Sequence, residues 1–217
     1  MRKKMLPLLI MFLLCVLLAR AGTTNADVLG TISVGPVPTI SAPGIEFNVT
    51  VSINVSPKID FYIIEPITWN PDIIELKNGG TLADIVEGPF MKNAGSTVFV
   101  PMGINNALGK IDQISCGFLD VVDVNGSGVL FTIQFRSKAV GETPIDIGYA
   151  VLLNSLVDPE WYLDPSNGLE LNDGSVTVVP EFSASVLLPL LLIATIIAII
   201  AAKALPRKRQ IRLITTS

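Results

Sequence analysis

The chain has 217 residues, of which 50% are hydrophobic, and it contains two cysteines and no histidine. Without histidine, Ser-His-Asp and Cys-His catalytic arrangements and imidazole metal sites are excluded. Residues 27–181 hold all 19 acidic residues and only six of the 15 basic ones, which gives this segment a net charge of −13. Nucleic acid binds basic surfaces, so we expect no nucleic-acid partner.

Residues 1–26 have the layout of a secretory signal peptide. A basic start, "MRKK", precedes an apolar run over 6–18, and small residues follow at Ala21 and Ala26. This order of basic, apolar and small residues is typical of secretory signals. We expect cleavage after Ala21 or Ala26; a retained N-terminal anchor is the alternative.

Residues 27–179 have the pattern of short β-strands. The stretch "GIEFNVTVSINVSP" alternates hydrophobic and polar residues, which predicts a strand with one buried and one wet face. Two later strands are expected to bury alternate residues in the same way: Val129, Phe131, Ile133 and Phe135 in one, and Ile145, Ile147, Tyr149 and Val151 in the other. Gly, Pro, Asn and Asp separate the strands, which is typical of an antiparallel sandwich.

The pattern predicts an all-β domain of nine strands with a single helical turn at 81–86. The nine expected strands are 28–34, 44–57, 59–68, 73–76, 97–103, 110–119, 128–136, 144–152 and 174–179. In the stretch "ITWNPDIIEL", Asn70-Pro71-Asp72 is turn chemistry, because proline presets φ and Asn and Asp bond back to nearby backbone. We interpret Trp69 as capping the core at this turn, with ligand contact as the alternative.

Other residues are candidates for binding or modification. Trp161 and Tyr162 lie in an acidic segment, where they would contact a sugar or protein partner or else pin their own loop. Asp120, Asp123 and Asn125 bring oxygen ligands together as calcium requires, although ordinary turn chemistry also explains them. We expect no resident cofactor, with calcium as the only one left open. Cys116 is expected to be a small buried hydrophobe.

Three asparagines lie in glycosylation sequons: Asn48, Asn54 and Asn125. The first two fall on the polar side of their strand, where a glycan would project outward. Pro57 directly follows the second sequon and is expected to weaken it.

"ITWNPDIIEL" resembles the strand-turn-strand signature of cohesin domains, and "VNGSGVLFTIQFRSKAVGETPIDI" resembles their second signature. "VSINVS" and the closing "DGSVTV" also fit, so the resemblance covers residues 27–179. It implies a nine-stranded jelly-roll or Ig-like sandwich, related in fold to some carbohydrate-binding modules. It also implies a partner of the dockerin class, a small calcium-loaded helical module that docks on a sheet face.

The C-terminal region predicts a membrane anchor. Residues 182–202 carry no charge and would form a helix of about 31 Å, close to the hydrocarbon thickness of about 30 Å. The basic residues after it predict a cytoplasmic tail over 203–217. Pro180-Glu181-Phe182, which precedes the apolar run, resembles the archaeal PEF-type sorting signal; a plain stop-transfer helix is the alternative.

Together these features predict a signal peptide over 1–26, a sandwich over 27–179, a linker and transmembrane helix over 180–202, and the basic tail. The β domain is expected outside the cell. We expect a non-catalytic surface module that binds a dockerin-like protein or a polysaccharide, and that takes part in polysaccharide breakdown. A structural or adhesive envelope protein is the alternative. A secreted hydrolase is disfavoured by the small size of the domain and by the absence of histidine.

Overall fold

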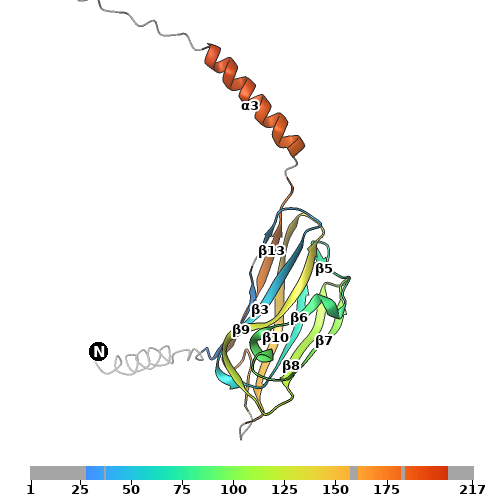
Figure 1. Ribbon diagram of the computed structural model, residues 1–217, viewed down its shortest axis with the longest axis vertical. Helices are drawn as coiled ribbons and strands as arrows, with labels where there is room; N and C mark the ends of the chain where they lie inside the picture. The colour runs from blue at the N-terminus through green and yellow to red at the C-terminus, as the bar shows by residue number, and fades with distance from the viewer. Residues whose placement is uncertain (1–27, 37, 157–160, 182–183, 205–217) are drawn as a thin grey trace, which may run out of the picture.

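Two β-sheets pack face to face in the computed structural model, which describes residues 28–36, 38–156, 161–181 and 184–204 (Figure 1). The six-stranded sheet consists, in order, of β12 (Leu169–Asn172), β1 (Gly30–Gly35), β3 (Glu46–Ile59), β9 (Val124–Ser137) and β5 (Ile74–Leu76), with β6 (Ile85–Glu87) also on β9. The seven-stranded sheet consists of β2 (Thr39–Ile40), β13 (Gly174–Val178), β10 (Gly141–Asn154), β4 (Phe61–Trp69), β8 (Lys110–Phe118) and β7 (Thr97–Asn105), with β11 (Trp161–Leu163) also on β10.

The predicted all-β sandwich is confirmed, but the predicted strand number and pairing are not. The described residues form strands β1 to β13, and each of the nine expected strands is among them. The extra strands β2, β6, β11 and β12 have two to four residues each, too few for alternation to reveal them. β1 pairs with β12, and β2 with β13, in parallel, so the sandwich is not purely antiparallel.

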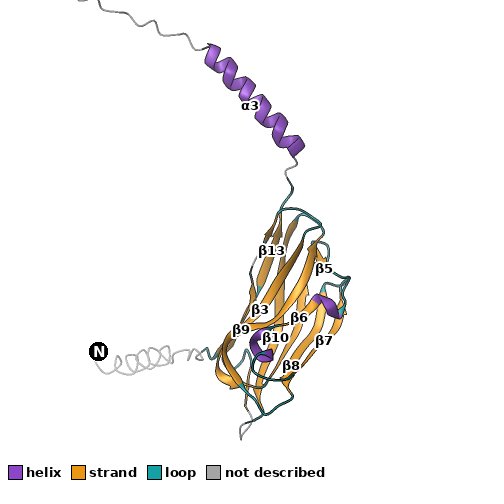
Figure 2. Ribbon diagram, in the orientation of Figure 1, coloured by secondary structure: helices purple, strands orange, loops and turns teal. Residues whose placement is uncertain are grey.

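Helical structure within the described sandwich is limited to two short pieces, drawn in purple in Figure 2. The helical turn expected at 81–86 is a 3₁₀ turn, η2 (Leu82–Asp84), which runs directly into β6. The helix α2 (Pro89–Lys92) follows and buries Phe90 and Met91 beside β9. Pro89 opens this helix, as is common at a first helical position.

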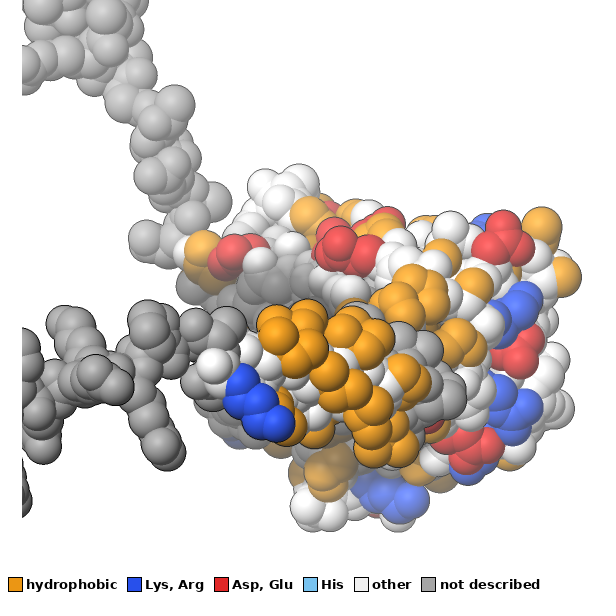
Figure 3. All heavy atoms as spheres, turned by 90° about the horizontal axis from the view of Figure 1, so that it is seen from above, with side chains coloured by type: hydrophobic (Ala, Val, Ile, Leu, Met, Phe, Trp, Pro, Cys, Tyr) orange, Lys and Arg blue, Asp and Glu red, His pale blue; other side chains and the backbone are white. Residues whose placement is uncertain are grey.

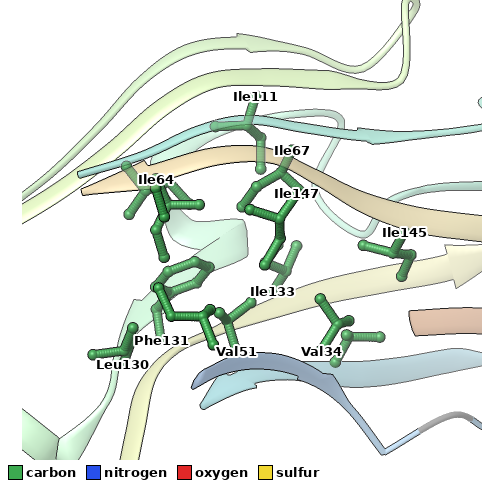
Figure 4. Close-up of a cluster of buried hydrophobic side chains, with 14 of the residues drawn as sticks. Val34, Val51, Ile64, Ile67, Ile111, Leu130, Phe131, Ile133, Ile145 and Ile147 are labelled. Carbon is green, nitrogen blue, oxygen red and sulfur yellow. The ribbon is translucent and has the colours of Figure 1, made fainter. Parts of the chain in front are cut away.

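The core lies between the sheets and is aliphatic with a few aromatic rings. Ile64 and Ile67 on β4 point toward Phe131 and Ile133 on β9, and all four are fully buried (Figure 4). The ring of Phe131 stacks on that of Tyr62, with centroids 6.5 Å apart. This contact between strands of opposite sheets joins the two layers of the sandwich.

The alternation of buried and exposed side chains changes phase in the middle of β10. The prediction that Tyr149 and Val151 are buried is therefore wrong. Ile147 is buried, but Tyr149 is 38% exposed and Ala150 is buried instead. Pro66 on β4 packs against Gly148, where a Cβ would lie 2.6 Å from the proline Cδ. Val151 therefore joins Tyr149 on the outer side of the sheet, although the sequence pattern placed both with the core.

A β-bulge in β9 likewise overturns the prediction that Val129 is buried. The register with β3 shifts between Val51, which pairs with Phe131, and Ser52, which pairs with Val129. One extra residue, Leu130, is accommodated there and is 2% exposed. Because Val129 pairs with an outward-facing serine, it does not share the buried face predicted for it.

Beyond the sandwich lies α3 (Ala184–Ala204), which projects away from the sheets (Figure 1). Its hydrophobic side chains, including Leu191 and Ile197, are exposed and gather in front of the domain when viewed from above (Figure 3). The expected transmembrane helix is not supported: in the described part of the chain, no helix is long and apolar enough to cross a membrane. The expected signal peptide and the basic tail over 205–217 lie outside the described residues.

Candidate binding face

The two sheets present chemically different outer sides. On the six-stranded sheet, the outward pairs between β3 and β9 are polar: Glu46 with Arg136, Asn48 with Gln134, Thr50 with Thr132, and Asn54 with Ser127. Glu46 is ion-paired with Arg136 at 2.9 Å and with Lys77 at 2.8 Å. A wet, charged surface of this kind is what an ordinary antiparallel sheet shows to solvent.

The outer side of the seven-stranded sheet carries hydrophobic side chains on four strands, β7, β4, β10 and β11. One row of paired residues runs across the strands as Val98, Gly117, Phe61, Leu153 and Tyr162, and the next as Val100, Ser115, Ile63 and Val151. We call the hydrophobic residues of these rows, with Met102 and Tyr149, the apolar face. Val98 and Met102 are each 46% exposed. Contiguous apolar surface of this kind marks an interaction site.

Phe61 lies flat against the middle of the apolar face because its neighbour is a glycine. A Cβ on Gly117 would stand 2.6 Å from Cδ2 of the phenylalanine ring. The ring therefore occupies the space that a side chain on β8 would fill, and it forms one wall of a small pocket. Leu153 and Phe118 form other walls of this pocket, whose volume is about 270 Å³.

Asp60 lies at the base of the same pocket, at the bend where the chain passes from β3 into β4. The residue is only 7% exposed. Its Oδ2 accepts hydrogen bonds from the backbone N–H of Ser155, at 3.0 Å, and from the serine hydroxyl. Its Oδ1 is buried and has no hydrogen-bond partner among the described residues. We call this site the Asp60 pocket.

A buried carboxylate oxygen without a donor is costly, because desolvation is not compensated. Native proteins keep few such groups, and each requires an explanation. Here the unpartnered oxygen belongs to a side chain that lines a surface pocket within the apolar face. The pocket leads to this side chain, and a hydrogen-bond donor that displaces the groups covering Oδ1 would satisfy it.

Tyr149 and Tyr162 lie at one side of the apolar face, where β11 extends the sheet beyond β10. The Tyr149 hydroxyl donates to Asp164 Oδ2 at 3.0 Å, which raises the pKa of Tyr149. Hydrogen bonds from the Ser166 hydroxyl and backbone lower the pKa of Asp164, together with the bond from Tyr149. These bonds fix the position of Tyr149 at the edge of the face.

The three aromatic residues proposed as ligand contacts have different surroundings. Trp69 is 5% exposed and lies in the core, edge-on to Phe135 with ring centroids 5.2 Å apart, so its indole is not at the surface. Trp161 is half-buried and packs against the core. Tyr162 is 56% exposed and belongs to the apolar face.

The residues proposed to bind calcium each make other contacts. Asp123 is ion-paired with Lys58 at 2.8 Å, Asp120 accepts a bond from the backbone of Ser96, and the Asn125 amide donates to a backbone carbonyl. Among the described residues, no group of three or more Asp, Glu, Cys or His side chains is placed to hold a metal ion. Calcium binding at Asp120, Asp123 and Asn125 remains a prediction.

The sequon residues Asn48, Asn54 and Asn125 are exposed on the six-stranded sheet. Their glycosylation remains a prediction. Pro180 and Glu181 of the proposed sorting motif are exposed beyond β13, and Phe182 lies outside the described residues.

The sequence reasoning missed Asp60, Phe61 and Val98. One signal was present: "DFYIIEPIT" lacks clean alternation, since Phe61, Ile63 and Tyr62 are all hydrophobic. A strand that is apolar on both sides is buried on both sides or binds something on one.

No family model matches the chain, and no curated protein matches it. Several solved structures are similar. A type I cohesin from Pseudobacteroides cellulosolvens has 18% sequence identity and a TM-score of 0.51; the match covers 71% of this chain and 95% of the cohesin chain. A cohesin module from a Clostridium perfringens family 33 glycoside hydrolase has 14% sequence identity and a TM-score of 0.53; the match covers 71% of this chain and 100% of the cohesin module.

A third similar structure is a type I cohesin–dockerin complex from Clostridium thermocellum, with 18% identity, a TM-score of 0.50, and coverage of 69% of this chain and 99% of that one. The sandwich therefore has the fold of a cohesin domain. The identities are too low to carry more than the fold.

Proposed function

We propose that this chain is a non-catalytic binding module that docks a protein partner of the dockerin class on the apolar face. The observation that carries the proposal is the Asp60 pocket: a buried carboxylate oxygen without a donor, at the end of the sheet where Phe61 and Leu153 belong to the exposed apolar face. The cohesin fold supports it, since one of the similar structures is a cohesin–dockerin complex.

The partner places an apolar patch on Val98, Phe61 and Leu153 and inserts a hydrogen-bond donor into the Asp60 pocket. Interfaces of this type depend on a few anchored groups at the centre, surrounded by contacts that exclude water. The donor is a hydroxyl or a basic side chain, because only a donor satisfies Oδ1. Exclusion of water strengthens that bond, because the local dielectric falls.

The test compares two lysine substitutions on opposite sheets. Val98 on β7 and Val86 on β6 are each 46% exposed, so Val98→Lys and Val86→Lys are matched in residue type and accessibility. Each full-length variant is immobilised and incubated with extract of the source cells, once with calcium and once with a chelator. We expect Val98→Lys to weaken capture of the partner at least about tenfold, and Val86→Lys to leave it unchanged.

Four results would contradict the proposal. Equal capture by wild type and Val98→Lys would exclude the apolar face, and loss only in Val86→Lys would move the site to the other sheet. Recovery of nothing but the chain itself would favour the alternative, a structural or adhesive envelope protein. Retention on insoluble polysaccharide through the apolar face, without a protein, would shift the function to carbohydrate binding and link it to polysaccharide breakdown.

We also propose that the domain acts outside the cell. The basic-apolar-small order of residues 1–26 supports export, and Pro180-Glu181-Phe182 supports processing near that point. Protease added to intact cells should degrade the domain, and mass spectrometry of the native protein should find new termini after Ala21 or Ala26 and near Pro180. A chain that keeps Met1 and resists protease on intact cells would overturn this proposal.

A further inference from the structure

A second pocket lies at the other end of the sandwich from the Asp60 pocket. It has a volume of about 570 Å³, within the usual range for small-ligand sites. Its walls come from the β4–β5 turn, β5, the loop after β5, the β7–β8 turn and the loop before β10. Asp60 precedes β4 and Pro71 follows it, so the strand rise separates the two sites by about 30 Å. We call this second site the end pocket.

The end pocket is held open by hydrogen bonds between loops. The carboxylate of Asp84, which is fully buried, accepts four bonds from Asn78, Gly80 and Thr81 and so fixes the loop after β5. Asn106 Oδ1 accepts the N–H of Leu76 at 2.8 Å, which ties the β7–β8 turn to β5. The bond from Leu76 to Asn106 joins edge regions of different sheets, and the bonds to Asp84 fix the loop beside it, so the pocket is formed before any ligand arrives.

The opposite wall is held in the same way. Lys138 Nζ donates to the Pro71 carbonyl at 2.7 Å and lies 3.8 Å from Glu75 Oε2. The N–H of Asp72 donates to Asn70 Oδ1, which closes the turn beneath it. The Asp72 carboxylate makes no hydrogen bond or ion pair with the described residues, and it is exposed at the pocket.

The chemistry of the lining favours a neutral ligand with many hydroxyl groups. Acceptors come from Asp72 and Glu75, and donors from Lys138 and the side-chain amides of Asn105 and Asn106. Two carboxylates disfavour an anion, and the ammonium group disfavours a simple cation. A hydroxyl both donates and accepts, so it matches a lining that holds both kinds of group.

We propose that the end pocket binds a saccharide, separately from the protein partner of the apolar face. The hydroxyl groups of one or two sugar units bond to Asp72, Glu75 and the Asn105 amide. The C–H side of a sugar ring rests on Ile104 and Pro71, which supply the hydrophobic part of the lining. Because the two sites lie at opposite ends of β4, the module holds its glycan and its protein partner at the same time.

The test is saturation-transfer NMR on the purified full-length chain with cellohexaose, xylohexaose and mannohexaose, each at millimolar concentration. We expect transfer to at least one of the three sugars. Asp72→Ala should weaken its binding about tenfold or more, because a charge-assisted hydrogen bond is lost. Glu170→Ala is the matched control: this carboxylate is also exposed but lies on β12, away from the pocket, and its loss should change nothing.

Three outcomes would overturn the inference. One is the absence of transfer to all three sugars, and another is binding that Asp72→Ala leaves unchanged. The third is sugar binding that Val98→Lys abolishes, because it would place the saccharide on the apolar face. The inference is independent of the proposed protein partner: capture of that partner can fail while the sugar still binds, and the reverse.

Discussion

Two buried aspartates should respond in opposite ways to the same substitution. Asp60 has one carboxylate oxygen with two donors and one with none among the described residues. Asp84 has two donors on each oxygen. Replacement by asparagine keeps the shape of each side chain, removes the charge and turns one acceptor into a donor. The structure therefore predicts little change in stability at Asp60 and a large loss at Asp84.

The magnitudes follow from the bonds at each site. In Asp60→Asn, the amide oxygen keeps both bonds from Ser155 in weaker, neutral form, at a cost of about 1 kcal/mol each. The amide N–H₂ that replaces Oδ1 is also without a partner, but a neutral group costs less to bury than a charged one, by an amount similar to the weakening of the two bonds. The free energy of unfolding should therefore change by no more than about 1 kcal/mol. In Asp84→Asn, an amide N–H₂ replaces an oxygen that accepts two hydrogen bonds, so donors face donors. The free energy of unfolding should fall by about 3 kcal/mol or more.

Thermal unfolding of the full-length variants, followed by circular dichroism at pH 7, measures the difference. For a domain of this size, 1 kcal/mol corresponds to about 2–4 °C in Tm. Asp84→Asn should therefore lower Tm by about 6–12 °C and Asp60→Asn by no more than about 4 °C. A large loss at Asp60 would show that its carboxylate is structural, and would remove the main support for the Asp60 pocket as a binding site. Asp60→Asn should also weaken partner capture about tenfold.

Three further predictions concern the sandwich itself. Gly148→Ala should destabilise the fold by about 1–3 kcal/mol in chemical denaturation, because its Cβ meets Pro66, whereas Gly35→Ala, with open space around it, should not; equal effects would contradict this. Burial, followed by the charge of a nearby glutamate, raises the pKa of Cys116 to about 12. In a Cys15→Ser variant, which leaves Cys116 as the one thiol, Ellman's reagent at pH 8 should label the chain only after unfolding, and labelling of the folded variant would refute the burial. The lowered pKa of Asp164 gives a stabilising contribution that is present above the unfolded value near 3.9 and lost as pH falls through the folded value. Asp164→Asn should therefore flatten the loss of stability below about pH 4, and an unchanged acid profile would contradict it.

Alternation in the sequence, together with the Gly, Pro, Asn and Asp residues that separate apolar runs, was sufficient to predict the nine main strands. It also placed Cys116 correctly in the interior, where it is 1% exposed. Sequence alone determined that the domain is acidic and that histidine chemistry is absent. These properties belong to single strands or to the composition, so they can be predicted without knowing how the strands pair.

The candidate sites depended on pairing between distant segments. Tyr149 and Val151 face outward only because the alternation of β10 changes phase where Gly148 meets Pro66, more than 80 residues earlier in the chain. The pattern of β10 by itself, with apolar residues on both sides of the change, predicted the opposite. A single-residue shift of phase moves every later side chain to the other face of a sheet, so the apolar face could not be read from one strand.

Asp60 shows the same limit. In sequence it is one acidic residue among 19, at the junction of two strands, where a solvated turn residue is the ordinary expectation. Only the folded chain brings Ser155 and Leu153 against it and excludes water from its second oxygen. Burial and hydrogen-bond satisfaction are properties of contacts made across many residues, and for that reason only the tertiary structure located the candidate binding sites.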